Sequence, residues 1–476
     1  MKKSEISDNW FLIFSSIFIL LFMLGGKEIW TEEIRWANIC QEMMIRHDYL
    51  HPYLFNRPYY DKPLLSYWII IAISHLIGKL NLWALRLPSA FAGLITIWGT
   101  YRLGSKLISQ QTGRIAAWLL ISTYFFVFWA RVASVDMLNV AGIILAIVWY
   151  FENKHKPCFS SYAIFFIILS IASLFKGLIA AAIVVIALLP DFITQNNWKK
   201  HLRWSLLFGA IPGLIIYLSP FLTSVYFNNQ HYTESGLWKV FQENFVRYLK
   251  PFDHKGHIYT YLIYLPIYIF PWILFFIPAI CSLPKRWGSM SANSRWLVWS
   301  LLLLFIFLTC SGSRRSYYIL PLLPLAILVT ADWIRLGAEQ MKIRNRLASQ
   351  VVVIFCIINF SIFGVIYPLA ASNGGEKQFA QDIRQQAEKI RPWPNWHIII
   401  SDINPKVSFY LHSPNLVEKS DPAYFPSNKN EILITRLNYF PEALKSKYIL
   451  IRMKQNLGDR LIGKQEPYTP IALIPI

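Results

Sequence analysis

The sequence predicts a polytopic α-helical membrane protein that carries a small C-terminal α/β domain. Of its 476 residues, 55% are hydrophobic and 15% are charged, and the mean hydropathy is +0.39. Apolar runs of about 18 to 22 residues recur along most of the chain, which is the length that a helix needs to cross a bilayer core. Because lipid leaves no partner for an open backbone group, such continuous runs indicate helices and not barrel strands.

Eleven of the apolar segments are predicted to cross the membrane. No small-residue cleavage site precedes GGKEIW, so the first segment is interpreted as a retained span and not as a signal peptide. Residues 64–78 are also apolar, and whether they span decides on which side every later loop lies. The predicted spans are residues 10–26, 84–104, 113–130, 137–152, 159–175, 177–193, 204–224, 258–283, 296–312, 316–335 and 347–369.

The distribution of lysine and arginine between the loops resolves this ambiguity. If residues 64–78 do not span, one side holds fifteen basic residues in short loops and also Lys2 and Lys3, whereas the opposite side, beyond the first loop, holds eight. Positive loops favour the cytoplasm, so residues 64–78 are predicted to form an interfacial or re-entrant helix on the outer face, with the N-terminus inside and the C-terminus outside. The fifteen are Arg102, Lys106, Arg114, Lys154, Lys156, Lys199, Lys200, Arg203, Lys285, Arg286, Arg295, Arg335, Lys342, Arg344 and Arg346.

Two further segments are predicted outside the membrane. In the first outer loop, residues 33–46 have the spacing of an amphipathic helix that lies on a membrane surface. From about residue 370 the composition changes, and helix-like QFAQDIRQQAEKI precedes strand-like HIIIS, EILIT and KYILIRM. We therefore expect a transmembrane domain over residues 1–370 and an outer-face α/β domain over residues 371–476.

The net charge of +20 does not indicate a nucleic-acid partner, because the basic residues are scattered through short loops and form no basic face. Positive-inside topology and attraction to anionic headgroups explain this charge, so the expected partners include membrane lipids and no nucleic acid. The five cysteines have no paired spacing, which excludes a disulfide framework and a CxxC metal site.

Ionisable residues at the ends of membrane helices are functional candidates. A lysine or arginine at such a position can also have no role beyond contacting anionic lipid headgroups. This explanation does not suit a lone carboxylate such as Asp136, because anionic headgroups repel it. A set of carboxylates and cations suits a transfer reaction in which phosphate is the leaving group. The cations bind the phosphate and stabilise its developing charge, and a carboxylate removes the proton of the acceptor. The predicted topology brings to the outer side Glu32, Glu33, Arg35, Asp61, Lys62, Arg131, Asp136, Lys176, Arg247, His254, His257, Arg314 and Arg315.

Several motifs together resemble the type C membrane glycosyltransferases. TEEIRWANICQEM and the later YYDKPLLSYW resemble the first outer loop of the branch that holds the aminoarabinose transferases of lipid A and the dolichyl-phosphate-mannose protein mannosyltransferases. ARVASVDMLNVAG resembles the acidic motif of their second outer loop, LFKGLIA their Lys-Gly helix break, and RRSYYILPLLPLAIL their basic-Tyr-Leu-Pro span. ENFVRYLKPFDHKGHIYTYLIYLPIYIFPW resembles their entry to the long outer loop. The resemblance covers residues 10 to 370 in the family's order.

The resemblance implies transfer of a sugar from a polyprenyl-phosphate donor to an acceptor at the periplasmic face of a bacterial inner membrane. It implies catalytic roles for Glu32 and Asp136. Donor phosphate binding is expected of Lys62, Arg35, Arg247 and Arg314, and the other site candidates are Glu33, Asp61, Lys176, His257, Arg315 and Tyr317. Two positions depart from the family: its first acid is usually Asp where this chain has Glu32, and its Lys-Pro-Pro is here Lys62-Pro63-Leu64.

Three functions are weighed. The outward α/β tail favours lipid A as the acceptor, and a protein O-mannosyltransferase with a Ser or Thr acceptor is the alternative. A lipid-linked sugar transporter would bury ionisable groups in mid-span and repeat its halves, whereas here the charges gather at one face. The sequence does not specify the sugar, the carrier length or a cofactor. A divalent metal at Asp61, His254 and His257 stays open, because the His spacing alone is a weak signal.

Overall fold

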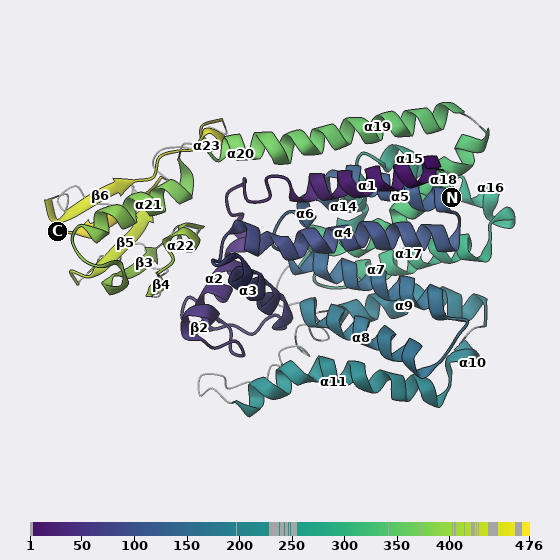
Figure 1. The fold of residues 1–476 in the computed structure, drawn as a ribbon, viewed down its shortest axis with the longest axis horizontal. Helices are drawn as coiled ribbons and strands as arrows, with labels where there is room; N and C mark the ends of the chain where they lie inside the picture. The colour runs from purple at the N-terminus through teal and green to yellow at the C-terminus, as the bar shows by residue number, and fades with distance from the viewer. Residues whose placement is uncertain are drawn as a thin grey trace. The chain divides into compact units, whose positions relative to one another are not determined.

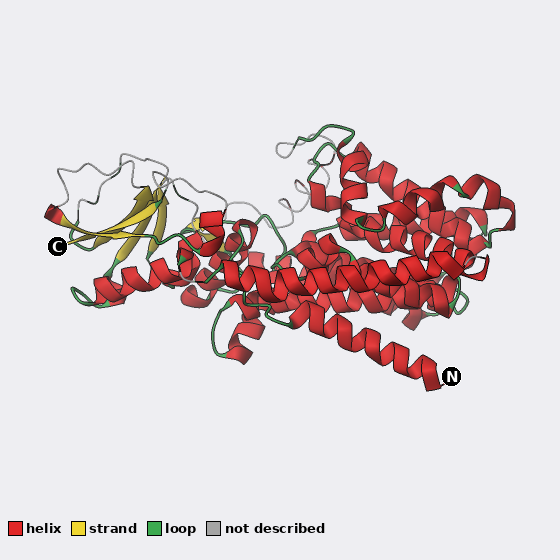
Figure 2. Ribbon diagram, turned by 90° about the horizontal axis from the view of Figure 1, so that it is seen from above, coloured by secondary structure: helices red, strands yellow, loops and turns green. Residues whose placement is uncertain are grey.

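The computed structural model describes residues 3–196, 198–227, 238, 242, 246, 248, 255–340, 342–372, 374–401, 403, 406–413, 415–419, 424, 426, 428–436, 446–461 and 469–476. The chain divides into two compact units. Unit 1 comprises residues 1–22, 60–69 and 86–360, and unit 2 comprises residues 23–59, 70–85 and 361–476. Unit 1 is built from helices, and all of the described strands belong to unit 2 (Figures 1 and 2).

The elements follow one another in a long helical series before the strands appear. The first helices are α1 (Lys3–Leu21), α2 (Thr31–Arg46), α3 (Leu65–Ile77), α4 (Leu82–Leu107), α5 (Gln110–Ser122), α6 (Tyr124–Ala130), α7 (Val135–Asn153), α8 (Phe159–Lys176), α9 (Ile179–Thr194), α10 (Trp198–His201) and α11 (Trp204–Tyr226). The later ones are α14 (Thr260–Ile269), α15 (Ile273–Cys281), α16 (Leu283–Arg286), η2 (Trp287–Ser289), α17 (Ala292–Cys310), η3 (Ser316–Leu322), α18 (Leu323–Gln340), α19 (Lys342–Ser361), η4 (Ile362–Ile366), α20 (Tyr367–Ala370), α21 (Gly375–Glu388), η5 (Trp393–Asn395), α22 (Lys406–Leu411) and α23 (Leu457–Leu461). The strands are β1 (Tyr53–Leu54), β2 (Arg57–Pro58), β3 (His397–Ser401), β4 (Leu416–Lys419), β5 (Glu431–Arg436), β6 (Tyr448–Arg452) and β7 (Pro470–Pro475).

The predicted helical membrane class is confirmed, but the count of eleven spans is not. Within the described residues, seven helices are long and apolar enough to cross a membrane, or up to nine if each of two bent helix pairs is one span. The predicted spans 113–130 and 258–283 are these pairs, with bends of 72° between α5 and α6 and 117° between α14 and α15. Pro271 lies in the second break, where its missing N–H prevents a continuous helix.

The ambiguous segment 64–78 forms α3. Its 13 residues reach about 20 Å at the helical rise of 1.5 Å per residue. A bilayer core is about 30 Å thick, so α3 is too short to span by itself, as the loop charges predicted. The apolar helices at residues 9–21 and 179–194 are also short, with 13 and 16 residues.

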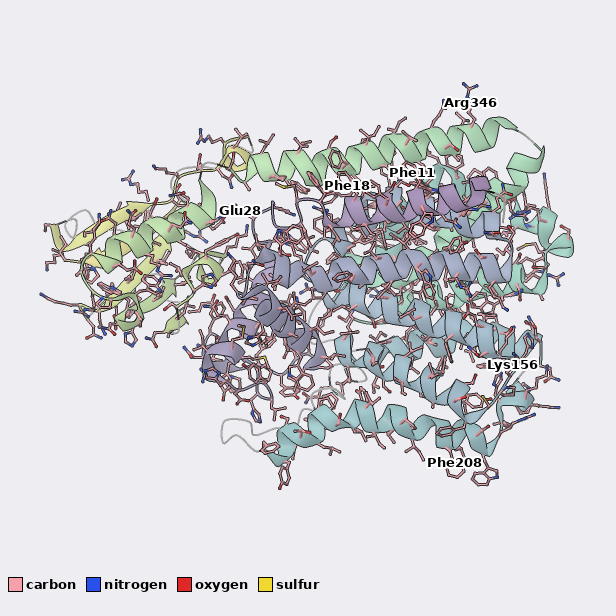
Figure 3. All side chains as sticks on the ribbon, in the orientation of Figure 1. Phe11, Phe18, Glu28, Lys156, Phe208 and Arg346 are labelled. Carbon is pink, nitrogen blue, oxygen red and sulfur yellow. The ribbon has the colours of Figure 1, made fainter. Side chains whose placement is uncertain are left out.

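The surface of unit 1 exposes many large apolar side chains. Phe11 of α1 and Phe208 of α11 are 64% and 55% exposed, and Phe208 extends outward from α11 (Figure 3). Single exposed hydrophobic residues are scattered over the surface of any soluble protein. Bands of exposed Phe, Ile, Leu and Trp on long apolar helices are instead typical of a lipid-facing surface. Within the bundle, α8 packs between α7 and α11 (Figure 1).

Unit 2 contains a five-stranded mixed sheet of strand order β4-β3-β5-β7-β6. β3 pairs in parallel with β4 and β5, and β7 pairs antiparallel with β5 and β6. Alternate residues of the strands face opposite sides, and one face packs on α21 and α22 through residues such as Phe379, Ile383 and Leu411. The predicted strands at HIIIS, EILIT and KYILIRM correspond to β3, β5 and β6, and the helix at QFAQDIRQQAEKI to α21.

The amphipathic helix predicted at residues 33–46 is α2, but its apolar side is not left for lipid. Ile34, Ala37, Ile39 and Met43 are buried in the protein. The side chain of Asn38 makes hydrogen bonds of 2.9 and 3.0 Å with Ser408 of α22. Because α22 belongs to the α/β part of unit 2, protein covers the face of α2 that we expected on a membrane surface.

Candidate active site

Close contact between α7 and α8 positions the first part of the site. A Cβ on Gly142 of α7 would lie 2.4 Å from the Cβ of Ala172 of α8, so only glycine allows this approach. Ala172 is one turn before Lys176, the last residue of α8. Gly177 follows with φ of 118°, which ends α8 and lets α9 start at Ile179. The Lys-Gly motif therefore forms the expected helix break.

Asp136 and Lys176 form an ion pair at this end of the two helices. Lys176 Nζ lies 2.5 Å from Asp136 Oδ1, with the side chains 15% and 9% exposed. The other carboxylate oxygen, Oδ2, accepts a hydrogen bond of 2.8 Å from Ser134 Oγ. Asp136 is in the first turn of α7, where the helix dipole favours a negative charge. Both oxygens of Asp136 are thus engaged, one by the ammonium of Lys176 and one by the hydroxyl of Ser134.

Lys62 lines the same cavity as Lys176. The cavity has a volume of about 100 Å³, which accommodates a group of phosphate size, and its polar lining also includes Asn139 and Tyr318. Lys62 Nζ donates a hydrogen bond of 3.1 Å to the carbonyl of Asp61. Lys176 Nζ lies 4.3 Å from the centre of the Tyr318 ring, an additional contact that fixes the ammonium. Two predicted site residues from distant parts of the sequence are therefore brought together.

Asn139 is a residue of this cavity that the sequence analysis missed. It lies one helical turn after Asp136, is 1% exposed, and its Oδ1 has no hydrogen-bond partner. A buried amide oxygen without a partner is costly, so a donor group from a ligand or water is expected there. A single Asn in an apolar helix gave no motif, but its spacing of three residues from Asp136 places both on one helix face.

The basic residues of the RRSYY motif have other partners in the structure. Arg314 donates hydrogen bonds to the carbonyl of Gly256, at 2.5 Å, and to that of Thr309, at 2.9 and 3.2 Å. Arg315 Nη1 donates a hydrogen bond of 2.8 Å to Tyr317 Oη. These contacts support the loop after α17, and the predicted phosphate contact of Arg314 stays a prediction.

The acidic pair and Arg35 belong to unit 2, on α2. Glu33 is fully buried and Glu33 Oε2 accepts a hydrogen bond of 2.8 Å from the backbone N–H of Trp30, so it caps the helix. Arg35 donates to Tyr59 Oη at 3.1 Å. Glu32 is half-buried and belongs to the same first turn as Glu33. Glu33 thus has a structural role as the cap of α2, whereas the catalytic role of Glu32 stays a prediction.

Of the possible metal ligands Asp61, His254 and His257, the structure describes Asp61 and His257. Asp61 is half-buried and His257 is exposed, with its ring stacked on Tyr259 at 5.0 Å. Arg247 and His254 lie outside the described residues. Among the residues that the structure describes, no group of three or more His, Cys, Asp or Glu side chains has a metal-binding arrangement.

A second buried polar cluster lies at the other end of α7, and the sequence analysis did not find its acid. Asp191 of α9 is fully buried and accepts hydrogen bonds of 2.8 Å from Lys154 Nζ and 2.6 Å from Tyr150 Oη. The 19 residues of α7 separate Asp136 from this cluster by about 28 Å. Asp191 therefore serves to neutralise Lys154 far from the candidate site.

Comparison with known proteins agrees with the motifs. The family model described as dolichyl-phosphate-mannose-protein mannosyltransferase matches residues 61–224. An undecaprenyl phosphate-alpha-4-amino-4-deoxy-L-arabinose arabinosyl transferase of Pseudomonas fluorescens is 26% identical over 67% of this chain and 56% of its own length. One from Edwardsiella ictaluri is 27% identical over 72% of this chain and 62% of its own length. The predicted resemblance to membrane glycosyltransferases is confirmed. The chain matches less than two thirds of the length of these glycosyltransferases.

Solved structures share the fold of this glycosyltransferase-like chain. ArnT from Cupriavidus metallidurans, crystallised with undecaprenyl phosphate, superposes with a TM-score of 0.75 at 14% identity, and the match covers 99% of this chain and 98% of ArnT. The oligosaccharyltransferase of Archaeoglobus fulgidus superposes with a TM-score of 0.56 at 10% identity, over 92% of this chain and 70% of its own. At these identities the likeness concerns the fold alone.

Proposed function

We propose that this protein is a glycosyltransferase that moves a sugar from a polyprenyl-phosphate donor to lipid A. The observation that carries the proposal is the small cavity lined by both Lys62 and Lys176. Two ammonium groups at one cavity suit the phosphate of such a donor. The names of the sequence relatives, which include undecaprenyl phosphate as the sugar carrier, support the same donor class.

The reaction proposed is a single inverting displacement. An acceptor oxygen forms a bond to the anomeric carbon of the sugar while the bond from that carbon to the donor's phosphate oxygen breaks. The electron pair of the broken bond stays on the polyprenyl phosphate, whose negative charge increases. Lys62 and Lys176 stabilise this charge, and Asp136 positions Lys176. Arg35, Arg247 and Arg314 remain proposed phosphate ligands.

Glu32 is proposed as the base that removes the proton of the acceptor. A neutral hydroxyl must lose its proton during attack, and a nearby carboxylate is a suitable base. An acceptor phosphate is already ionised and transfers no proton. Asn139 lines the cavity and its buried amide oxygen has no hydrogen-bond partner, so it is proposed to accept a hydrogen bond from a hydroxyl of the bound donor.

The membrane orientation is part of the proposal. Lys156 and Arg346 lie toward the same end of unit 1 (Figure 3), and Lys154 is at the end of α7 opposite to Asp136. Positive loops favour the cytoplasm, so the cavity of Lys62 is assigned to the periplasmic face of a bacterial inner membrane. Residues 1–370 are proposed as the transmembrane glycosyltransferase domain and residues 371–476 as the outer α/β domain.

A protein O-mannosyltransferase is the second candidate, because the matching family model carries that description. Mass spectrometry of lipid A and of envelope glycoproteins, from cells with and without the protein, separates the two. The proposal expects a sugar-sized mass increase on lipid A that depends on the protein. The same increase on Ser or Thr peptides, with unchanged lipid A, would favour the second candidate instead.

A further inference from the structure

Unit 2 contains its own large cavity, which the transfer reaction described above does not use. Its volume is about 780 Å³, within the range of about 300 to 1,000 Å³ that is typical of ligand pockets. All of its lining residues belong to unit 2, from the segments near residues 25–28 and 79–83, from α20 and α21, and from α22 with the residue after it.

The charge of the lining is mainly positive. Lys27, Lys79 and Lys377 contribute three ammonium groups, and Glu28 contributes one carboxylate. Glu28 Oε2 accepts a hydrogen bond of 3.0 Å from Asn456 Nδ2, which holds this carboxylate at the wall. Across the described part of the chain, no carboxylate forms an ion pair with Lys79 or Lys377. These two lysines are therefore available to an anion.

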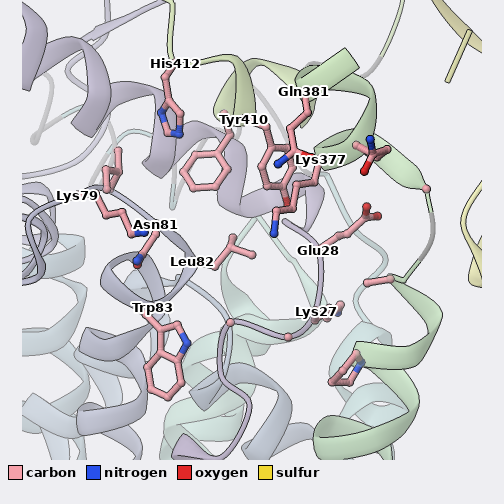
Figure 4. Close-up of a pocket in the computed structure, with 18 residues that line it drawn as sticks. Lys27, Glu28, Lys79, Asn81, Leu82, Trp83, Lys377, Gln381, Tyr410 and His412 are labelled. Atoms are coloured by element: carbon pink, nitrogen blue, oxygen red, sulfur yellow. The ribbon is translucent and has the colours of Figure 1, made fainter. Parts of the chain in front are cut away.

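The start of α21 adds to this potential. Gly374 precedes the helix without a side-chain cap and lines the cavity together with Lys377 and Gln378 of the first turns. The N–H of Gly375 donates to the carbonyl of Lys454 at 2.8 Å, so this end of α21 contributes through its dipole, which favours a negative group at the start of a helix of 14 residues. Figure 4 shows Lys377 extending from α21 between Tyr410 and Glu28.

The rest of the lining suits a sugar. Trp83, which is 40% exposed, and Tyr410 present aromatic surface at different sides of the cavity (Figure 4). A sugar ring has a C–H face that packs on aromatic rings and hydroxyls that need donors and acceptors. Asn81 and Gln381 also line the cavity, and their amide groups supply both. Lysines alone would suit any anion, whereas this combination selects a larger ligand.

We propose that this cavity binds a phosphate-bearing saccharide, with Lys79, Lys377 and the start of α21 at the phosphate and Trp83 and Tyr410 at the sugar. The inference concerns binding by unit 2 and does not require the proposed transfer reaction. The ligand is either a soluble sugar phosphate or the headgroup of a phosphorylated glycolipid, since both present a phosphate and a sugar ring to the cavity.

Isothermal titration of the purified full-length protein tests this proposal without any sugar donor. Trehalose 6-phosphate is the probe. Trehalose, which has the sugar without the phosphate, and inorganic phosphate, which has no sugar, are the control ligands. We expect trehalose 6-phosphate to bind at least about tenfold more tightly than trehalose or inorganic phosphate. The hydrogen bonds to its phosphate and the packing of its sugar ring both contribute to the binding free energy. Equal binding of inorganic phosphate, or no binding of trehalose 6-phosphate, would overturn the proposal.

Variants locate the binding. Lys79→Ala and Lys377→Ala should each weaken binding of trehalose 6-phosphate about tenfold, while Lys389→Ala, an exposed lysine outside the cavity, should have no effect. Unchanged binding in the double variant Lys79→Ala/Lys377→Ala would refute the assigned site. Competition with lipid A in nanodiscs then identifies the source: displacement of the probe indicates a lipid headgroup, and its absence a soluble sugar phosphate.

Discussion

Lys176 at the end of α8 and Asp136 in the first turn of α7 form an ion pair of 2.5 Å at the cavity that also contains Lys62. The two residues are 40 positions apart in the chain. Their pairing gives the carboxylate a positioning role, because it fixes an ammonium group beside the proposed donor phosphate.

The first prediction concerns this pair. Lys176→Ala should lower kcat about 100-fold, the usual cost of one donor to a developing anion. Asp136→Asn should lower it less, because Lys176 keeps its charge but loses its fixed position. A double-mutant cycle on kcat should show that the two losses are not additive. Strictly additive losses would mean that Asp136 acts independently of Lys176.

The second prediction concerns Glu32. Glu32→Gln should slow transfer to a neutral hydroxyl about 100- to 10,000-fold and should affect transfer to a phosphate acceptor much less. Glu32→Asp, which restores the residue usual in the family, should remain active. The matched control is Glu33→Gln, which should lower thermal stability through the loss of the α2 cap and leave acceptor preference unchanged. Wild-type rates of Glu32→Gln with every acceptor would remove Glu32 from the mechanism.

Sequence reasoning succeeded where a pattern was regular and failed where only packing shows the role. Short apolar runs between Pro- and Asn-rich turns predicted β3, β5 and β6, but not β4, which has only four residues, or β7, which begins with Pro470. The bends at 72° and 117° were missed because hydropathy measures composition and not direction.

At the site, Lys62, Asp136 and Lys176 were found because motifs marked them, and the structure shows which of them meet. Asn139 and Asp191 were missed because no motif marked either residue, and their roles show only once the cavity and the ion pair with Lys154 are known. Glu33 was grouped with Glu32 by adjacency, and only the hydrogen bond to Trp30 separates them.

The third prediction concerns stability. Lys154→Met leaves the fully buried carboxylate of Asp191 without its ammonium partner, and breaking such a pair costs about 3 to 5 kcal/mol. Thermal unfolding in detergent should show a clear drop in Tm, with partial recovery in Lys154→Met/Asp191→Asn. Lys156→Met, at an exposed position of the same loop, is the control. An unchanged Tm for Lys154→Met would show that the pair is not stabilising.

The fourth prediction concerns orientation. In a variant without native cysteines, single cysteines at His257 and Lys389, both exposed, should react with a membrane-impermeant maleimide in intact spheroplasts. A cysteine at the exposed Lys199 should react only after permeabilisation. Labelling of positions 257 and 389 from opposite sides would contradict the assignment of both to the periplasm.

The fifth prediction, on Lys62, tests the central claim most directly. Purified protein is incubated with a radiolabelled polyprenyl-phosphate sugar and lipid A, and the label transferred is counted for the wild type, Lys62→Ala, Lys62→Arg and the exposed control Lys389→Ala. We expect transfer by the wild type and by Lys389→Ala, partial transfer by Lys62→Arg, which keeps the charge in a different geometry, and almost none by Lys62→Ala at equal Tm. Full transfer by Lys62→Ala would contradict the proposed phosphate site, and no transfer by the wild type would contradict the proposed reaction.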